Sequence, residues 1–174
     1  MNDELAAELA RMAAEDQRIR QSPKNSTGFA RRLTVEERMR HARVDVANTD
    51  RLRVIVARHG WPGRSLVGDQ GAEDAWLLAQ HADRQLDFQR EALVLLAEAV
   101  AADEAQRRYL AYLTDRVRMN EGREQLYGTQ VGDVDEGIPW PIEDREAVDD
   151  RRASMGLESL AVYLRGFASH DRDG

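Results

Sequence analysis

The sequence contains no cysteine, and this absence excludes several kinds of site at once. Disulfide bonds, thiolate zinc sites and cysteine nucleophiles all need the missing thiol. A chain without cysteine also fits a reducing compartment, so we expect a cytoplasmic protein. Its 174 residues, 42% of them hydrophobic, are enough to bury about two-thirds of the unfolded surface in one compact domain, so stability does not require a covalent cross-link.

Long apolar runs are also missing. The longest, such as EALVLLAEAV, are too short and too interrupted to cross about 30 Å of hydrocarbon, so we predict no membrane helix. The N-terminal stretch MNDELAAELA opens with acidic residues, whereas a secretory signal opens with basic residues followed by an apolar run. We therefore expect neither a membrane partner nor export by that route.

The chain lacks an excess of basic residues. Its formal net charge of -7 opposes nonspecific binding to nucleic acid, because such binding depends on basic patches that displace counterions. One segment, ARRLTVEERMRHAR, gathers arginines, but Glu36 and Glu37 interleave with them. We favour a solvated helix face over a phosphate-binding patch for this segment and expect no nucleic-acid partner.

Familiar catalytic and nucleotide-binding signatures are absent. There is no GxSxG nucleophile elbow, Walker loop or GxGxxG fingerprint, so the sequence indicates no particular cofactor. The stretch GWPGRSLVG matches none of these motifs, and we favour a rigid loop in which Trp61 packs and Pro62 fixes the turn. The histidines form no HxxxH or HExxH pair, and we predict no metal site. A site assembled from His59, His81 and Asp115 on separate helices is the weaker alternative.

Helical periodicity is what the sequence does contain. It predicts a mainly α protein, folded as a single-domain helical bundle that comprises residues 1–174. Leu5, Leu9 and Ile19 recur at helical spacing, and they predict an amphipathic helix over residues 3–20.

A second helix is predicted to start near Thr34 and to end near Arg58. Thr34 stands three residues before Glu37, which is the spacing of a capping box. The other expected helices span about 73–101 with a possible break near Asp87, 103–119, 144–155 and 157–167. The expected connections are a loop at 20–33, an ordered glycine and proline loop at 60–72, an irregular loop or short hairpin near 121–141, and a frayed tail at 168–174.

Several polar side chains share these helical stripes with apolar residues, namely Asp16, Asp45, Asn48, His81 and Asp115. Burying one unpaired polar group costs about 1–3 kcal/mol, so such groups must be paired, hydrated or accessible. For each residue taken alone, a satisfied hydrogen bond is the simpler interpretation. One polar cavity shared by Asp16, Asn48, His81 and Asp115 would instead explain these four together.

The stretch QLYGTQ, residues 125–130, raises the same alternatives in an irregular segment. Tyr127 and Gln130 are either structural plugs, with the phenol filling a gap and the amide capping a helix end, or groups that close a pocket. Gly128 would let the backbone approach a ligand, and Thr129 adds a hydroxyl. Both interpretations stay open.

Several uncommon strings occur together in order: HGWPGRSLVG, QHAD, AYLTDR, EGREQLYGTQ and PIED followed by RRASMGL. In these motifs the chain resembles a family of bacterial proteins recorded only as a domain of unknown function. The resemblance covers roughly residues 40–165, and DQRIR near residue 16 also belongs to it. It implies that the motif positions matter: Gln80, His81, Asp83, Asp115, Arg116, Gln125, Tyr127, Gly128 and Gln130.

These positions suggest an enzyme that acts on a small molecule by acid–base chemistry. His81 would be the general acid or base, because an imidazole exchanges protons near neutral pH. Asp115 is the preferred residue to orient it, since Asp83 lies only two positions away and faces elsewhere on a regular helix. Tyr127 would complete the catalytic set, as a donor to a developing oxyanion.

Further motif residues would bind the substrate. Arg116 can hold a carboxylate or phosphate through two hydrogen bonds, and Gln130 can donate a hydrogen bond to an oxyanion. The proposed binding set is Gln80, Arg116, Gln125, Gly128 and Gln130.

The alternative is a non-catalytic module that binds a protein or a small ligand. Trp61, Trp140 and Pro141 would then be anchors, as aromatic residues often are at interfaces. Geometry separates the two hypotheses. An enzyme requires His81, Asp115 and Tyr127 to converge on a concave pocket, whereas a partner module requires an apolar patch near the tryptophans.

Overall fold

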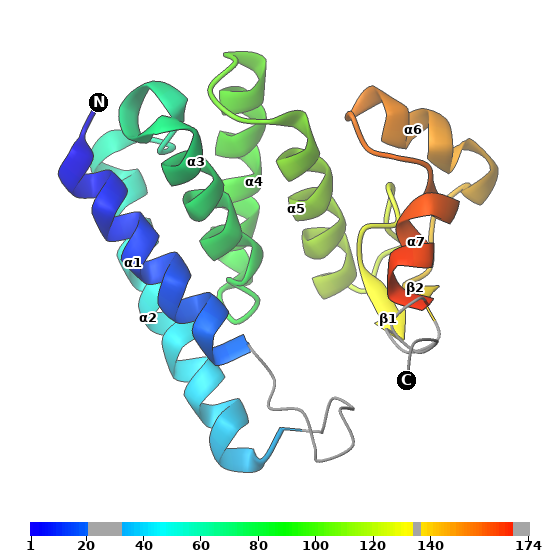
Figure 1. Cartoon of the computed structure of the whole chain (residues 1–174), viewed down its shortest axis with the longest axis horizontal. Helices are drawn as coiled ribbons and strands as arrows, with labels where there is room; N and C mark the ends of the chain where they lie inside the picture. The colour runs from blue at the N-terminus through cyan, green and yellow to red at the C-terminus, as the bar shows by residue number, and fades with distance from the viewer. Residues whose placement is uncertain (21–32, 134–136, 169–174) are drawn as a thin grey trace. The chain divides into compact units, whose positions relative to one another are not determined.

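The computed structural model describes residues 1–20, 33–133 and 137–168. The chain divides into two compact units, Met1–Leu95 and Leu96–Gly174 (Figure 1). The single domain expected from the sequence stays a prediction. The mainly α class is confirmed. The predicted 20–33 loop and the tail fall almost wholly outside the described residues.

The first unit contains α1 (Asp3–Arg20), α2 (Val35–His59), α3 (Arg64–Gln80) and the beginning of α4 (Leu86–Ala101). Helices α1, α2 and α3 lie side by side and pack against one another (Figure 1). The apolar stripes meet in a core of fully buried side chains that includes Leu9, Leu52, Ile55 and Leu78. The predicted helix over residues 3–20 is therefore confirmed.

The start of α2 is the predicted capping box. The Thr34 hydroxyl accepts a hydrogen bond from the Glu37 amide at 3.2 Å, and the Glu37 carboxylate accepts one from the Thr34 amide at 2.7 Å. Such a cap contributes about 0.5–2 kcal/mol to a helix. At the other end, Gly60 adopts a φ of +71°, and its amide donates to the carbonyl of Val56.

The expected 60–72 loop is wrong for most of its length, because α3 already begins at Arg64. Glycine is a weak helix former, and the glycines of this stretch suggested a loop. Only Gly68 departs from helical geometry, with a φ of +76°, and it kinks the helix. At Gly71 a Cβ would lie 2.7 Å from the Cβ of Val67, so the absence of a side chain at Gly71 allows this close approach of the backbone to Val67.

The break expected near Asp87 falls slightly earlier, between the end of α3 at Gln80 and the start of α4 at Leu86. Gln89, which is fully buried, stabilises this turn. Its side-chain amide donates to the carbonyl of Ala79 at 3.3 Å and to that of Gln80 at 3.2 Å. These carbonyls belong to the last turn of α3, and that of Ala79 also accepts a hydrogen bond from the Ala82 amide at 3.2 Å, so Gln89 adds a side-chain donor to the end of the helix.

The second unit contains the rest of α4, α5 (Arg107–Asn120), β1 (Val131–Asp133), β2 (Ile138–Pro139), a 3-10 turn η1 (Arg145–Ala147), α6 (Val148–Ser154) and α7 (Leu160–Ala168). The hairpin expected near 121–141 is confirmed, since β1 and β2 pair antiparallel with Val131 opposite Pro139. The helix expected at 144–155 is η1 followed by α6. Gly156, with a φ of +71°, follows it as expected.

Arg152 is a buried cation of the second unit. Its Nε donates to the carbonyl of Glu158 at 2.6 Å, and its Nη1 donates to the carbonyl of Tyr127 at 2.7 Å. The guanidinium also lies over the ring of Tyr163, 4.9 Å from the centroid. Arg152 thus connects α6 to α7 and to the segment that carries Tyr127.

Candidate functional site

A histidine–aspartate pair lies in the first unit. His81 follows α3 directly, and its Nδ1 lies 2.8 Å and 3.0 Å from the two carboxylate oxygens of Asp16 on α1. The side chain of Asp16 is 1% exposed, and that of His81 is 17% exposed. An ionised carboxylate only accepts hydrogen bonds, so Nδ1 of His81 is the donor in this contact. The other ring nitrogen, Nε2, makes no hydrogen bond with the described residues.

Arg20 and Asp45 extend the pair into a cluster. Arg20, one turn after Asp16, donates to that carboxylate from Nε at 3.2 Å and from Nη2 at 3.1 Å. The same Nη2 binds the carboxylate of Asp45 on α2. Asp16, Arg20, Asp45 and His81 are called the Asp16 cluster below.

The two carboxyl groups of the cluster differ in pKa. Burial by itself would raise the pKa of Asp16, but the hydrogen bonds from His81 and Arg20 together outweigh it and hold that pKa below its ordinary value. Burial raises the pKa of Asp45, and the attraction of Arg20 only partly offsets it. Asp16 therefore stays ionised, while Asp45 takes up a proton more readily.

Two side-chain amide atoms from residues close in sequence to the cluster are buried without a hydrogen-bond partner in the described residues. They are Nδ2 of Asn48, one turn after Asp45, and Oε1 of Gln80, which precedes His81. An unpaired buried donor or acceptor costs about 1–3 kcal/mol, so both atoms mark places where a polar group is favoured. Within the described ranges, no three His, Asp or Glu side chains come together as metal ligands.

An open groove of about 540 Å³ lies along α1 and α3. Its lining includes Ala13 and Gln17, which flank Asp16 in the sequence, and Leu77, which stands one turn before His81. The side chain of Gln17 donates to the Asp16 carboxylate at 3.0 Å. Gln17 thus links the groove to the Asp16 carboxylate, although none of the four residues of the Asp16 cluster is among those that line it. The volume of the groove lies in the usual range of small-molecule sites.

Asp115 belongs to the second unit, where it holds a loop in place. Its carboxylate accepts hydrogen bonds from the amides of Leu126 at 2.7 Å, Tyr127 at 3.1 Å and Thr129 at 2.9 Å. The Thr129 hydroxyl donates as well, at 2.9 Å. Burial raises the pKa of this carboxyl, although these hydrogen bonds favour its charged form. Asp115 is the structural anchor of the QLYGTQ segment.

The two glutamines of QLYGTQ are also bonded within the unit. The Gln125 side chain donates to the carbonyls of Gln130 at 3.0 Å and Trp140 at 2.7 Å, and it accepts from the Gln130 amide at 2.9 Å. The Gln130 side chain accepts from Arg116 at 3.1 Å. These contacts favour the structural interpretation of both glutamines.

Gly128 and Tyr127 differ in their contacts: Gly128 is closely surrounded by side chains, whereas the Tyr127 side chain is partly exposed. Gly128 has a φ of +69°, which favours glycine, and a Cβ there would lie 2.8 Å from the terminal methyl groups of both Ile142 and Leu160, which would have to move. Tyr127 is partly exposed, and its hydroxyl makes no hydrogen bond with the described residues. Burial raises the pKa of that phenol, which keeps it protonated and able to donate.

The structure therefore pairs His81 with Asp16, a residue that the catalytic set from the sequence did not include. Asp115 and Tyr127 lie in the other unit, and their joint action with His81 stays a prediction. The same holds for substrate binding by Gln80, Arg116, Gln125, Gly128 and Gln130. A signal for the missed residues was present, because Asp16 and Asp45 both share stripes with apolar side chains. Only the helix packing shows that they meet.

A family model matches residues 3–171, which is almost the whole chain. The chain belongs to DUF6624, a family of unknown function. The resemblance expected from the motifs is thereby confirmed. No curated protein and no solved structure matches the chain. None of the described helices is both long enough and apolar enough to cross a membrane.

Proposed function

We propose that the Asp16 cluster is an acid–base site that transfers a proton to or from a small molecule in the groove along α1 and α3. One observation carries the proposal: Nδ1 of His81 is held by a buried carboxylate, while Nε2 has no partner among the described residues. A carboxylate in this position fixes the tautomer of the ring and stabilises the imidazolium that forms when Nε2 accepts a proton.

Asp45 supplies a second proton-exchanging group. Environments that push the pKa values of two carboxyl groups apart are typical of sites that divide acid and base roles. Asp16, with the lowered pKa, positions His81, and Asp45, with the raised pKa, takes up a proton more readily than an ordinary carboxyl group. Arg20 contacts both carboxyl groups and keeps the cluster from accumulating negative charge.

The groove favours a ligand that carries hydrogen-bond donors. Glu73 and Asp74 line it together with Gln17 and Gln70, and the flat ring of Trp76 adds apolar surface. An amine or a polyhydroxylated molecule matches acidic and amide oxygens of this kind. We therefore assign the substrate to the class of small polar molecules with amino or hydroxyl groups.

The test is His81→Asn. An asparagine amide at this position can still donate to Asp16, but nothing replaces Nε2. The wild type and the variant are incubated with a mixture of small polar metabolites, and mass spectrometry follows their consumption. His59→Asn is the matched control, because His59 is an exposed histidine at the end of α2.

We expect at least one metabolite to be consumed by the wild type and by His59→Asn, but about a hundredfold more slowly by His81→Asn. Equal consumption by His81→Asn would exclude His81 as the acid or base. Binding of the same metabolites without consumption by any of the three proteins would instead support the non-catalytic ligand-binding module.

A further inference from the structure

One face of α2 carries an exposed apolar stripe made of Val35, Met39, Ala42 and Val46. The steps between them are four, three and four residues, which is the spacing of the a and d positions in a coiled coil. Val35 is 64% exposed and Met39 is 56% exposed, so these side chains are not part of the core. Among the described residues of the first unit, no helix covers this stripe.

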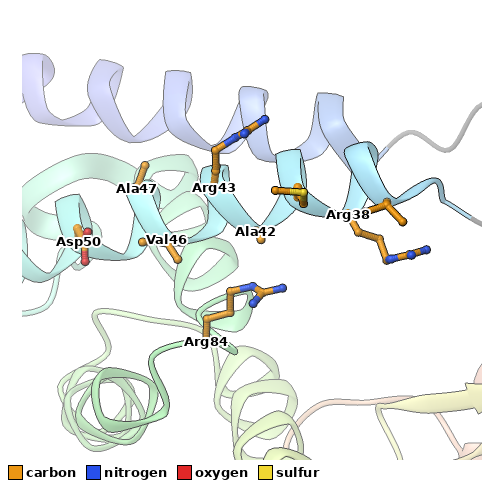
Figure 2. A pocket seen from close by; sticks show the side chains of 9 residues that line it. Arg38, Ala42, Arg43, Val46, Ala47, Asp50 and Arg84 are labelled. Carbon is orange, nitrogen blue, oxygen red and sulfur yellow. The ribbon is translucent and has the colours of Figure 1, made fainter.

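The stripe forms the floor of an open groove of about 660 Å³ (Figure 2). Arg43 and Arg84 lie on opposite sides of Ala42 and Val46 in this view, and Arg84 comes from the turn that follows α3 (Figure 2). Arg38 adds a third guanidinium to the lining. An apolar strip with charged margins is typical of an interaction site.

The charges of these margins are unbalanced. Neither Arg43 nor Arg84 makes a hydrogen bond or ion pair with the described residues, and Arg38 donates only to the carbonyl of Leu33. Asp50, the acidic residue of the lining, accepts a hydrogen bond from Gln85 at 2.7 Å. The groove is thus locally positive in a chain with a net charge of -7.

We propose that this groove binds an amphipathic helix of a partner protein, with an apolar seam on the stripe and acidic residues on both flanks. The heptad spacing suits a helix, and its two acidic flanks would pair with Arg43 and Arg84. The stripe is about 16 Å long at 1.5 Å per residue, which corresponds to about three turns of a bound helix.

Other occupants fit the charges less well. A second copy of this chain would bring the same arginines against one another, and like charges disfavour that pairing. A single-chain amphiphile has one anionic end and would meet a cation at that end alone. Residues 21–32 of this chain contain Lys24, Arg31 and Arg32 and no acidic residue, so they carry the same sign as the groove.

The experiment uses three synthetic peptides and the full chain. The first peptide has three heptads with leucine at a and d and glutamate at e and g. The second replaces those glutamates with lysine, and the third keeps the composition of the first but scrambles the order. Fluorescence anisotropy measures binding of each labelled peptide at moderate salt.

We expect the acidic peptide to bind at least about tenfold more tightly than the other two. Arg43→Glu and Arg84→Glu should each weaken its binding by about fivefold or more, because attraction becomes repulsion. Arg58→Glu is the matched control, since Arg58 is an exposed arginine of α2 outside the groove, and it should leave the affinity unchanged. Met39→Gln should weaken binding without any change of charge.

Four outcomes would overturn the proposal. The first is no binding of the acidic peptide, and the second is equal binding of all three peptides. The third is a dimer in sedimentation velocity that Met39→Gln converts to a monomer while the peptide fails to bind, which would assign the stripe to a second copy. The fourth is binding of palmitate but not of the peptide, which would assign the groove to an amphiphile.

Discussion

Replacing Asp115 by alanine should remove the anchor of the QLYGTQ segment in the second unit. The carboxylate satisfies the backbone amides of Leu126, Tyr127 and Thr129, as well as the Thr129 hydroxyl. Alanine would leave three backbone donors without their acceptor in a buried place. The perturbation is therefore the loss of a network rather than of one hydrogen bond.

The magnitude follows from these donors. Each buried donor left unpaired costs about 1–3 kcal/mol, so three of them give an upper range of about 3–9 kcal/mol if the loop stays closed. The loop can open and let water reach the amides, which limits the cost to the range usual for a broken buried network. We expect Asp115→Ala to lower the free energy of unfolding by about 3–5 kcal/mol.

Equilibrium unfolding in urea measures this loss, and hydrogen exchange of the amides of residues 126, 127 and 129 locates it. Asp149→Ala is the matched control. Its carboxylate accepts a single hydrogen bond, from the Leu160 amide at 2.7 Å, and the residue is exposed. That variant should lose only about 0.5–1.5 kcal/mol. Equal losses in the two variants, or unchanged exchange at the three amides, would refute the anchoring role of Asp115.

Three further predictions concern other residues. Gly128→Ala should lower the free energy of unfolding by about 2–4 kcal/mol, because alanine would have to adopt a positive φ and would crowd two neighbouring side chains. A loss of less than about 1 kcal/mol in urea unfolding would contradict this. Arg152→Met should lower the free energy of unfolding by about 3–5 kcal/mol in the same assay, because the carbonyls of Tyr127 and Glu158 lose their donor. An unchanged free energy would show that those carbonyls find other partners. The pKa of Asp16 is lowered in the folded protein, so its charge stabilises the fold at a pH above the ordinary pKa of 3.8, and this stabilisation is lost as the pH falls through the lower folded-state pKa. The difference in unfolding free energy between wild type and Asp16→Asn should therefore shrink from pH 5 to pH 3. A difference that widens over this range would show that the pKa shift has the opposite sign.

Local features of the fold were predictable because their causes lie within a few residues. Thr34 and Glu37 begin α2 through contacts that span one helical turn. The hairpin between β1 and β2 was anticipated from glycine, proline and β-prone residues in one stretch. The predicted start of α3 was wrong because it also relied on local composition. The glycines of this stretch predicted a loop, but within α3 only Gly68 has a non-helical φ.

The candidate site was predictable only in part. His81 was noted as a polar group on an apolar row, and Asp16 was noted for the same reason. Their pairing was not predicted, and Asp115 was chosen as the partner instead. Asp115 is engaged by its own loop, at a sequence separation of eleven to fourteen residues that helix spacing does not reveal.

The sequence by itself determined the helical class, the Thr34 capping box and the apolar stripes, because each depends on the order of neighbouring side chains. It also pointed to some of the buried polar residues, such as Asp16 and Asp115, but not to Gln89 or Arg152. The tertiary structure decided which polar groups meet. The bond between Asp16 and His81 joins residues 65 positions apart, and it depends on how α1 and α3 align along their length. That alignment is set by the packing of many side chains together, and no single stretch of sequence contains it.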